Sequence, residues 1–145
     1  MKKMIKTLLT LSLVLLLVGC KKTQVQPFTL QLFYYDTCSR CNAFKESALP
    51  DLRHEFGEAL TIEYYNLDSE EGLNKYNEVI QNLDQFDQEY YKETPLIVID
   101  QHFAVVGYNG QKENEELIKE IKRSLNNEPL GDYFTMGRYE FKQGE

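Results

Sequence analysis

Residues 28–41 read FTLQLFYYDTCSRC, a mainly apolar run that ends in two cysteines three positions apart. The apolar part, Phe28–Tyr35, is rich in aromatic side chains and predicts a buried β-strand. Residues 42–56 have apolar side chains at helical spacing, so we expect the chain to pass from a strand through the cysteines into a helix. This order, with Cys38 and Cys41 at the start of the helix, is typical of a dithiol redox centre.

The start of a helix is a suitable place for a redox-active cysteine pair. The spacing of Cys38 and Cys41 brings two sulfurs to one side of a helical turn, close enough for a disulfide. The unpaired N–H groups and the partial positive charge at a helix N-terminus stabilise a thiolate, which is the reactive form of cysteine. Arg40, between the two cysteines, adds a fixed positive charge that should favour the thiolate further.

Two other interpretations of the cysteine pair remain open. A purely structural disulfide would close a very short loop, and a loop of that length contributes only about 2 kcal/mol to stability. Half of a structural zinc site would need more ligands, but the chain has only two histidines, His54 and His102, and no second cysteine pair. His54 is expected to be a solvated residue on the first helix. We therefore favour the redox interpretation, which involves no metal and no cofactor.

The first residues are typical of a secretion signal rather than of the fold. Lys2, Lys3 and Lys6 precede an apolar stretch from Leu8 to Val18. This stretch is shorter than the roughly 20 apolar residues that span a bilayer. The chain has 145 residues and a hydrophobic fraction of 42%, which leaves enough sequence for one globular domain after the signal.

The sequence Leu17-Val18-Gly19-Cys20 resembles the bacterial lipobox, in which a small residue precedes a cysteine that becomes lipidated. We therefore expect a lipoprotein signal peptide over residues 1–19, lipid that includes palmitate on Cys20, and a tether over residues 20–27. This arrangement predicts anchoring in a bacterial cell membrane on the extracytoplasmic side, where disulfides persist.

The charge of the chain excludes some partners. Removal of residues 1–19, with their three lysines, would change the formal net charge from −7 to −10. A surface this acidic argues against nucleic-acid binding, which needs a basic footprint. It also argues against electrostatic binding to anionic lipids, so the lipid on Cys20 would be the membrane anchor.

The remaining elements follow at regular intervals. We expect strands at residues 61–66, 96–99 and 103–106, a first helix bent at Pro50, a long helix from Asp68 or Ser69, and a last helix from Glu113 or Asn114 to Leu125. The acidic and aromatic segment 84–92 either extends the long helix or forms a short helix of its own. These elements define one domain over residues 28–127, followed by a tail over residues 128–145 whose aromatic side chains pack on the domain or contact a partner.

This order of elements resembles the thioredoxin superfamily over most of residues 28–127. Two motifs carry the resemblance. One is the cysteine motif at residues 37–41, and the other is Thr94-Pro95, directly before a β-branched run. It implies an α/β three-layer sandwich with a central mixed sheet of about four strands between helices. It also implies that the bond before Pro95 is cis and that Thr94 and Pro95 lie beside the cysteines, where they bind substrate together with Arg40.

The sequence also departs from this family. Thr37 stands where thioredoxins have tryptophan, and Ser39-Arg40 stand where they have Gly-Pro. The buried carboxylate that assists the second cysteine in thioredoxins has no clear match, because Glu63 is the only acid of residues 61–66. These departures affect the substrate and the direction of electron flow rather than the fold.

The resemblance implies a thiol–disulfide oxidoreductase that acts on secreted or envelope proteins. Cys38 would be the attacking residue and Cys41 the resolving residue. A thiolate-stabilising site favours an oxidase or isomerase over a reductase. The alternative function is a non-enzymatic scaffold that binds a secreted peptide, more loosely similar to thioredoxin-like accessory proteins of bacteriocins, since a fold alone does not determine function. We expect a monomer, with room for a redox partner in the membrane.

Overall fold

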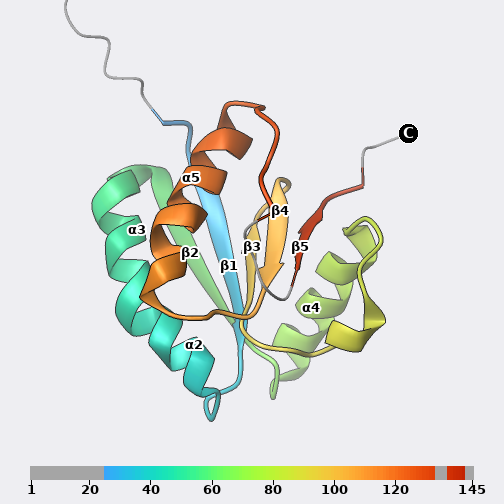
Figure 1. Ribbon diagram of the computed structural model, residues 1–145. Coiled ribbons are helices and arrows are strands. Elements are labelled where there is room, and N and C mark those ends of the chain that lie inside the picture. The colour runs from blue at the N-terminus through green and yellow to red at the C-terminus, as the bar shows by residue number, and fades with distance from the viewer. Residues whose placement is uncertain (1–24, 133–136, 143–145) are drawn as a thin grey trace, which may run out of the picture.

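The structure is a computed structural model that describes residues 25–132 and 137–142 (Figure 1). The expected signal peptide, the lipidation site Cys20 and most of the tether lie outside these residues. Tyr133 and Phe134 of the expected tail also lie outside them. Within the described part of the chain, no helix is both long enough and apolar enough to cross a bilayer.

The fold is built on one mixed β-sheet with the strand order β2-β1-β3-β4-β5. The strands are β1 (Phe28–Tyr34), β2 (Leu60–Asn66), β3 (Leu96–Ile99), β4 (Phe103–Val106) and β5 (Arg138–Glu140). β1 and β2 run parallel, and every other neighbouring pair runs antiparallel. All four residues of β3 are buried, as expected for the β-branched run at the centre of the sheet.

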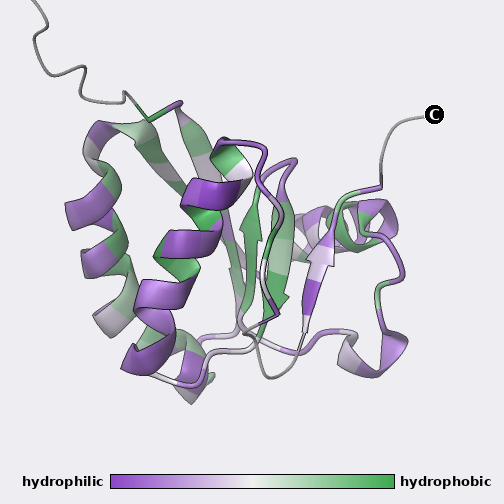
Figure 2. Cartoon of the chain, turned by 45° about the horizontal axis from the view of Figure 1, so that its top comes forward, coloured by the Kyte–Doolittle hydropathy of each residue, from purple (hydrophilic) through white to green (hydrophobic). Residues whose placement is uncertain are grey.

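The helices cover both faces of this sheet (Figure 1). They are α2 (Ser39–Ala43), α3 (Leu49–Phe56), α4 (Glu70–Asn82) and α5 (Asn114–Leu125). α3 and α5 lie on one face and α4 lies on the other, so the molecule has three layers. Figure 2 shows that hydrophobic residues of the helices lie mainly on the sides that face the sheet and hydrophilic residues on the outer sides.

The alternation of side chains along β1 divides the core into two clusters. The cluster on the α3 and α5 face includes Leu30, Leu32, Phe44, Leu52 and Ile121. The cluster on the α4 face includes Phe33, Tyr76, Val79, Leu96 and Val98. Because β1 contributes to both clusters, it is buried on both sides, which explains why its sequence becomes continuously apolar toward its end.

The predicted irregularity in the first helix is present in a different form. A π-helical turn, Phe44–Ala48, separates α2 from α3, and Pro50 lies in the first turn of α3. Proline has no N–H to donate to the preceding turn, so the regular α-helical pattern cannot continue through it. Gly57, with φ 52°, ends α3 where the sequence predicted.

The boundaries of the later helices follow from capping. Ser69 precedes α4 and its Oγ accepts a hydrogen bond of 3.0 Å from the N–H of Gly72. α4 ends at Asn82, so segment 84–92 does not extend it and instead contains a short 3₁₀ turn, Gln88–Tyr90. α5 starts at Asn114, one of the two predicted positions.

The α/β class and the mixed sheet were predicted correctly, but the expectation of about four strands was wrong. The fifth strand, β5, lies in the segment expected to be a tail and pairs antiparallel with β4. Tyr139 and Phe141 pack against the core cluster on the α4 face. Between α5 and β5, the buried Glu120 accepts a hydrogen bond of 2.6 Å from the N–H of Gly131 and ties the segment after α5 to that helix.

The packing of β5 generates a stability prediction. We expect Tyr139→Ala to lower the free energy of unfolding by about 2 kcal/mol, because it removes a partly buried ring that lies 4.9 Å from the ring of Phe86. Tyr64, which is 45% exposed, provides a matched control, and Tyr64→Ala should change the stability less. Urea unfolding followed by circular dichroism measures both values. Equal losses in the two variants would contradict a role of β5 in the core.

Candidate active site

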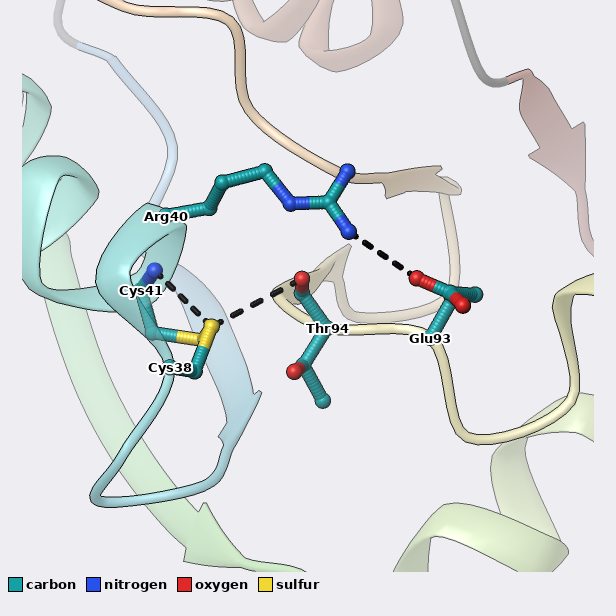
Figure 3. Close-up of a disulfide and its surroundings, with 5 residues drawn as sticks. All are labelled: Cys38, Arg40, Cys41, Glu93 and Thr94. Carbon is teal, nitrogen blue, oxygen red and sulfur yellow. Dashed lines mark hydrogen bonds and ion pairs between the residues drawn. A yellow bond between two sulfur atoms is a disulfide. The ribbon is translucent and has the colours of Figure 1, made fainter.

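Cys38 and Cys41 form a disulfide where the chain leaves β1 and enters α2 (Figure 3). Their Cα atoms lie 5.2 Å apart. Cys38 occupies the N-cap position of α2, and its Sγ accepts a hydrogen bond of 3.0 Å from the backbone N–H of Cys41. The sulfur therefore takes the place that a capping oxygen usually occupies at a helix start. After reduction, the same N–H group would stabilise a thiolate on Cys38.

The two sulfurs lie in different environments. Cys41 is fully buried, whereas Cys38 is partly exposed. A partner thiol from solvent can therefore approach Cys38, and Cys41 is shielded by the helix and the core.

The segment before β3 forms the second side of the site. The carbonyl oxygen of Thr94 lies 3.7 Å from Sγ of Cys38, and the Thr94–Pro95 bond is cis, as predicted. A disulfide sulfur has no hydrogen to donate, but a reduced Cys38 thiol could donate one to this carbonyl. The structure thus places Thr94 and Pro95 beside the cysteines.

Strand pairing explains how residues so distant in sequence meet. β1 pairs antiparallel with β3, with Phe33 opposite Leu96 at one end of the register and Leu30 opposite Ile99 at the other. In an antiparallel pair, the end of one strand lies beside the beginning of the other. The cysteine pair follows β1 and Thr94-Pro95 precede β3, so the register brings them to the same edge of the sheet.

An ion pair connects the same two segments above the disulfide. Nη2 of Arg40, on α2, lies 2.9 Å from Oε2 of Glu93, directly before Thr94. Figure 3 shows the side chain of Arg40 reaching across toward the loop that carries Glu93. Both side chains are partly exposed, 39% for Arg40 and 44% for Glu93. Glu93 was not among the residues predicted from the sequence, because nothing in the sequence alone shows that it meets Arg40 across the site.

The buried Tyr76 of α4 holds the loop that leads to Glu93. Its hydroxyl accepts a hydrogen bond of 2.7 Å from the N–H of Lys92 and donates one of 3.4 Å to the carbonyl of Tyr90. Burial raises the pKa of Tyr76 to about 12, although the hydrogen bond from Lys92 acts in the opposite direction. Nothing in the sequence alone points to this role of Tyr76.

Other candidate residues lie elsewhere or have other partners. Glu63 accepts hydrogen bonds from Gln31 (3.2 Å) and Tyr65 (2.9 Å), so the one acid of β2 is engaged within the sheet. His54 is exposed on α3, as expected. Over residues 25–132 and 137–142, no group of three or more histidine, cysteine, aspartate or glutamate side chains is arranged to hold a metal ion.

No family model matches this chain, and no curated protein matches it. The chemistry of the site must therefore be argued from its geometry. That geometry comprises a disulfide at a helix start, a partly exposed Cys38, a buried Cys41 and a carbonyl close to the exposed sulfur. This arrangement is suited to the exchange of a disulfide with an incoming thiol.

The raised pKa of Tyr76 generates a prediction about alkaline stability. In the unfolded chain this tyrosine loses its proton near pH 10.0, whereas the folded protein retains it up to about pH 12. Its contribution to stability is therefore fully present below pH 10 and is lost as the pH rises toward 12. The loss should reach at most about 1.4 kcal/mol per pH unit in this range.

The variant Tyr76→Phe tests this prediction. At neutral pH it should be less stable than the wild type by about 1–2 kcal/mol, because the N–H of Lys92 loses its buried acceptor. Between pH 10 and 12 its stability should fall less steeply, because the titrating hydroxyl is absent. Tyr64→Phe, at an exposed position, is the control. Equal slopes in the wild type and Tyr76→Phe, measured by guanidinium unfolding, would contradict the prediction.

Proposed function

We propose that this protein is a thioredoxin-like thiol–disulfide oxidoreductase, anchored to the membrane through lipid on Cys20 and acting on secreted or envelope proteins. The observation that carries the proposal is the Cys38–Cys41 disulfide at the start of α2, with Cys38 partly exposed and Cys41 buried. A disulfide that served only stability would not need one cysteine that is partly exposed and whose sulfur accepts a hydrogen bond from a backbone N–H.

The fold and the second side of the site support the same proposal. A mixed sheet between helices, with the cysteine pair at the end of β1 and Thr94-Pro95 before β3, is compatible with a thioredoxin-like arrangement. In that arrangement Thr94 and Pro95 contact the substrate chain next to the attacked sulfur. The carbonyl of Thr94, at 3.7 Å from Sγ of Cys38, is placed where it would border a bound substrate.

The reaction begins with attack on the protein disulfide. A substrate thiolate attacks Sγ of Cys38, a bond forms between the two sulfurs, and the Cys38–Cys41 bond breaks with its electron pair left on Cys41. A second substrate thiolate then attacks the substrate sulfur of this mixed disulfide and expels Cys38 as a thiolate. The substrate leaves with a disulfide, and the protein retains both electrons as a dithiol. A disulfide-donating partner would have to reoxidise it for another cycle.

The environment of Cys38 favours this oxidising direction. Cys38 leaves as a thiolate at the N-terminus of α2, where the N–H of Cys41 points at its sulfur. Stabilisation of the thiolate stabilises the reduced protein and makes its disulfide a stronger oxidant. The measured reduction potential decides the direction, because known oxidants lie near about −120 mV and known reductants near about −270 mV.

The proposed roles of the cysteines generate the central prediction. We expect Cys41→Ser to trap oxidised substrates on Cys38 as mixed disulfides. The thiolate of Cys38 attacks a substrate disulfide, in the reverse of the second step above, and the thiol of Cys41 that would then expel the substrate is absent. Cys38→Ser should trap few or none, because Cys41 is buried. Non-reducing electrophoresis with mass spectrometry of the bands detects these complexes. The double variant, with serine at both positions, is the control for adventitious adducts.

The other outcomes of this experiment are also informative. Equal trapping by both single variants would show that the two roles are assigned wrongly. An absence of trapping by either variant, together with no turnover in insulin reduction or peptide oxidation, would overturn the enzymatic proposal. It would support the non-enzymatic scaffold instead.

The proposed anchor has its own test. We expect mass spectrometry of the membrane fraction to find an N-terminal peptide that begins at Cys20 and carries a diacylglyceryl group. Cys20→Ala should lack the modification and should shift away from the membrane fraction. Cys38→Ser, which leaves residues 17–20 intact, is the matched control and should remain lipidated. A Cys20→Ala protein that stays bound to the membrane as strongly as this control would refute the anchor.

A further inference from the structure

We propose that Glu93 sets the redox bias of the cysteine pair by holding the guanidinium of Arg40 on the loop side of the site. This inference rests on the proposed function and identifies a positioning residue for it. Arg40 lies between the two cysteines in sequence, and its charge would favour a thiolate on Cys38 if it lay beside the sulfur. The ion pair with Glu93, at 2.9 Å, directs that charge across to the neighbouring loop instead (Figure 3).

Each partner of the ion pair is adjacent in sequence to a group that contacts Sγ of Cys38. Arg40 precedes Cys41, whose N–H donates to this sulfur at 3.0 Å. Glu93 precedes Thr94, whose carbonyl lies 3.7 Å from it. The two segments joined by the ion pair therefore also form the immediate surroundings of Sγ of Cys38.

Both partners are anchored through their backbones. The N–H of Glu93 donates a hydrogen bond of 2.9 Å to the carbonyl of Tyr90, and the preceding Lys92 is bound to the buried hydroxyl of Tyr76. The carbonyl of Arg40, in the first turn of α2, accepts a hydrogen bond from the N–H of Phe44. The guanidinium of Arg40 can still change its position through rotation about the bonds of its long side chain. Glu93 therefore supplies a carboxylate for this guanidinium from a braced position on the loop.

Other charged residues on the segments around the disulfide contact residues outside this ion pair. Asp36 accepts a hydrogen bond of 3.0 Å from Asn66, Lys45 lies 3.5 Å from the ring centre of Tyr34, and Lys92 lies 5.4 Å from that of Tyr91. Among the described contacts of these residues, the ion pair of Arg40 and Glu93 is the one that joins α2 to the loop before β3. The negative charge of Glu93, on the loop before β3, thus acts on Arg40 of α2.

The expected effect follows from competition for one cation. With Glu93 present, the guanidinium is shared with a carboxylate. With Glu93→Gln, this carboxylate no longer competes with the thiolate of Cys38 for the guanidinium, and the pKa of Cys38 falls. Because both side chains are about two-fifths exposed, solvent screens the charge and the change is modest. We expect a decrease of about half a pKa unit, which is about a threefold change in an equilibrium constant.

A double-mutant cycle in the full-length chain tests this proposal. The four proteins carry Arg40 and Glu93, Arg40→Gln alone, Glu93→Gln alone, or both substitutions. The pKa of Cys38 is measured in a Cys41→Ser background from the pH dependence of alkylation by iodoacetamide, with mass spectrometry of the peptide that contains Cys38. The same four changes are made in the protein with both cysteines, and its equilibrium with reduced and oxidised glutathione is measured at pH 8.

The cycle has a defined expected result. Glu93→Gln should lower the pKa of Cys38 by about half a unit and raise the equilibrium constant for reduction by glutathione about threefold. In the Arg40→Gln background the same change should have less than half of this effect. Glu93→Asp, which keeps the charge, should restore most of the wild-type value. Glu89→Gln removes an exposed acid from the same loop and is the control for net charge.

Three results would overturn the proposal. Equal shifts in both Arg40 backgrounds would show that Glu93 acts through its own charge and not through Arg40. A change in stability with no change in the pKa of Cys38 would show a purely structural ion pair. An equal shift from Glu89→Gln would show a general charge effect. These readouts do not depend on catalytic turnover, so a failure of the proposed function, detected by the trapping experiment, remains distinguishable from a failure of this inference.

Discussion

The antiparallel register between β1 and β3 is the constraint on which the site depends. It places the end of β1, with the cysteine pair, beside the start of β3, with Thr94-Pro95. A shift of this register by one residue would move every side chain of β3 to the opposite face, and both faces of this strand are buried. The packing of the two core clusters therefore fixes the distance between Cys38 and the carbonyl of Thr94. The chemistry at the edge of the sheet is a consequence of burial at its centre.

Two layers of contacts then convert this register into a defined environment for the sulfurs. The first layer is backbone, since the N–H of Cys41 and the carbonyl of Thr94 both approach Sγ of Cys38. The second layer consists of side chains, with Tyr76 supporting the loop and Arg40 connected to Glu93 across the site. Backbone groups are fixed by the fold and set the general reactivity. In the second layer, Arg40 and Glu93 are partly exposed and can change without loss of the fold, whereas Tyr76 is part of the core.

Most of the fold could be predicted from the sequence because it depends on local patterns. The apolar run before Cys38, the β-branched run after Pro95 and the capping residue Ser69 each carry their own signal. Two features lacked such a signal. β5 has only three residues and no alternation long enough to recognise, so its pairing depends on how the chain returns after α5. Arg40 and Glu93 are separated by 53 positions, and only the three-dimensional structure shows that their side chains meet.

The position of β5 also has a consequence for the solubility of the protein. β4 consists of Phe103–Val106, all buried, and without a neighbour it would present an apolar strand with unpaired backbone groups, a ready template for association with another chain. β5 covers this edge and replaces it with a short strand that carries Arg138 and Glu140, whose side chains form an ion pair of 2.7 Å. Charged and very short outer strands discourage further pairing. By pairing with β4, β5 therefore protects this edge of the sheet against aggregation. A nascent chain in which β5 has not yet been synthesised would leave the edge of β4 unpaired and open to self-association.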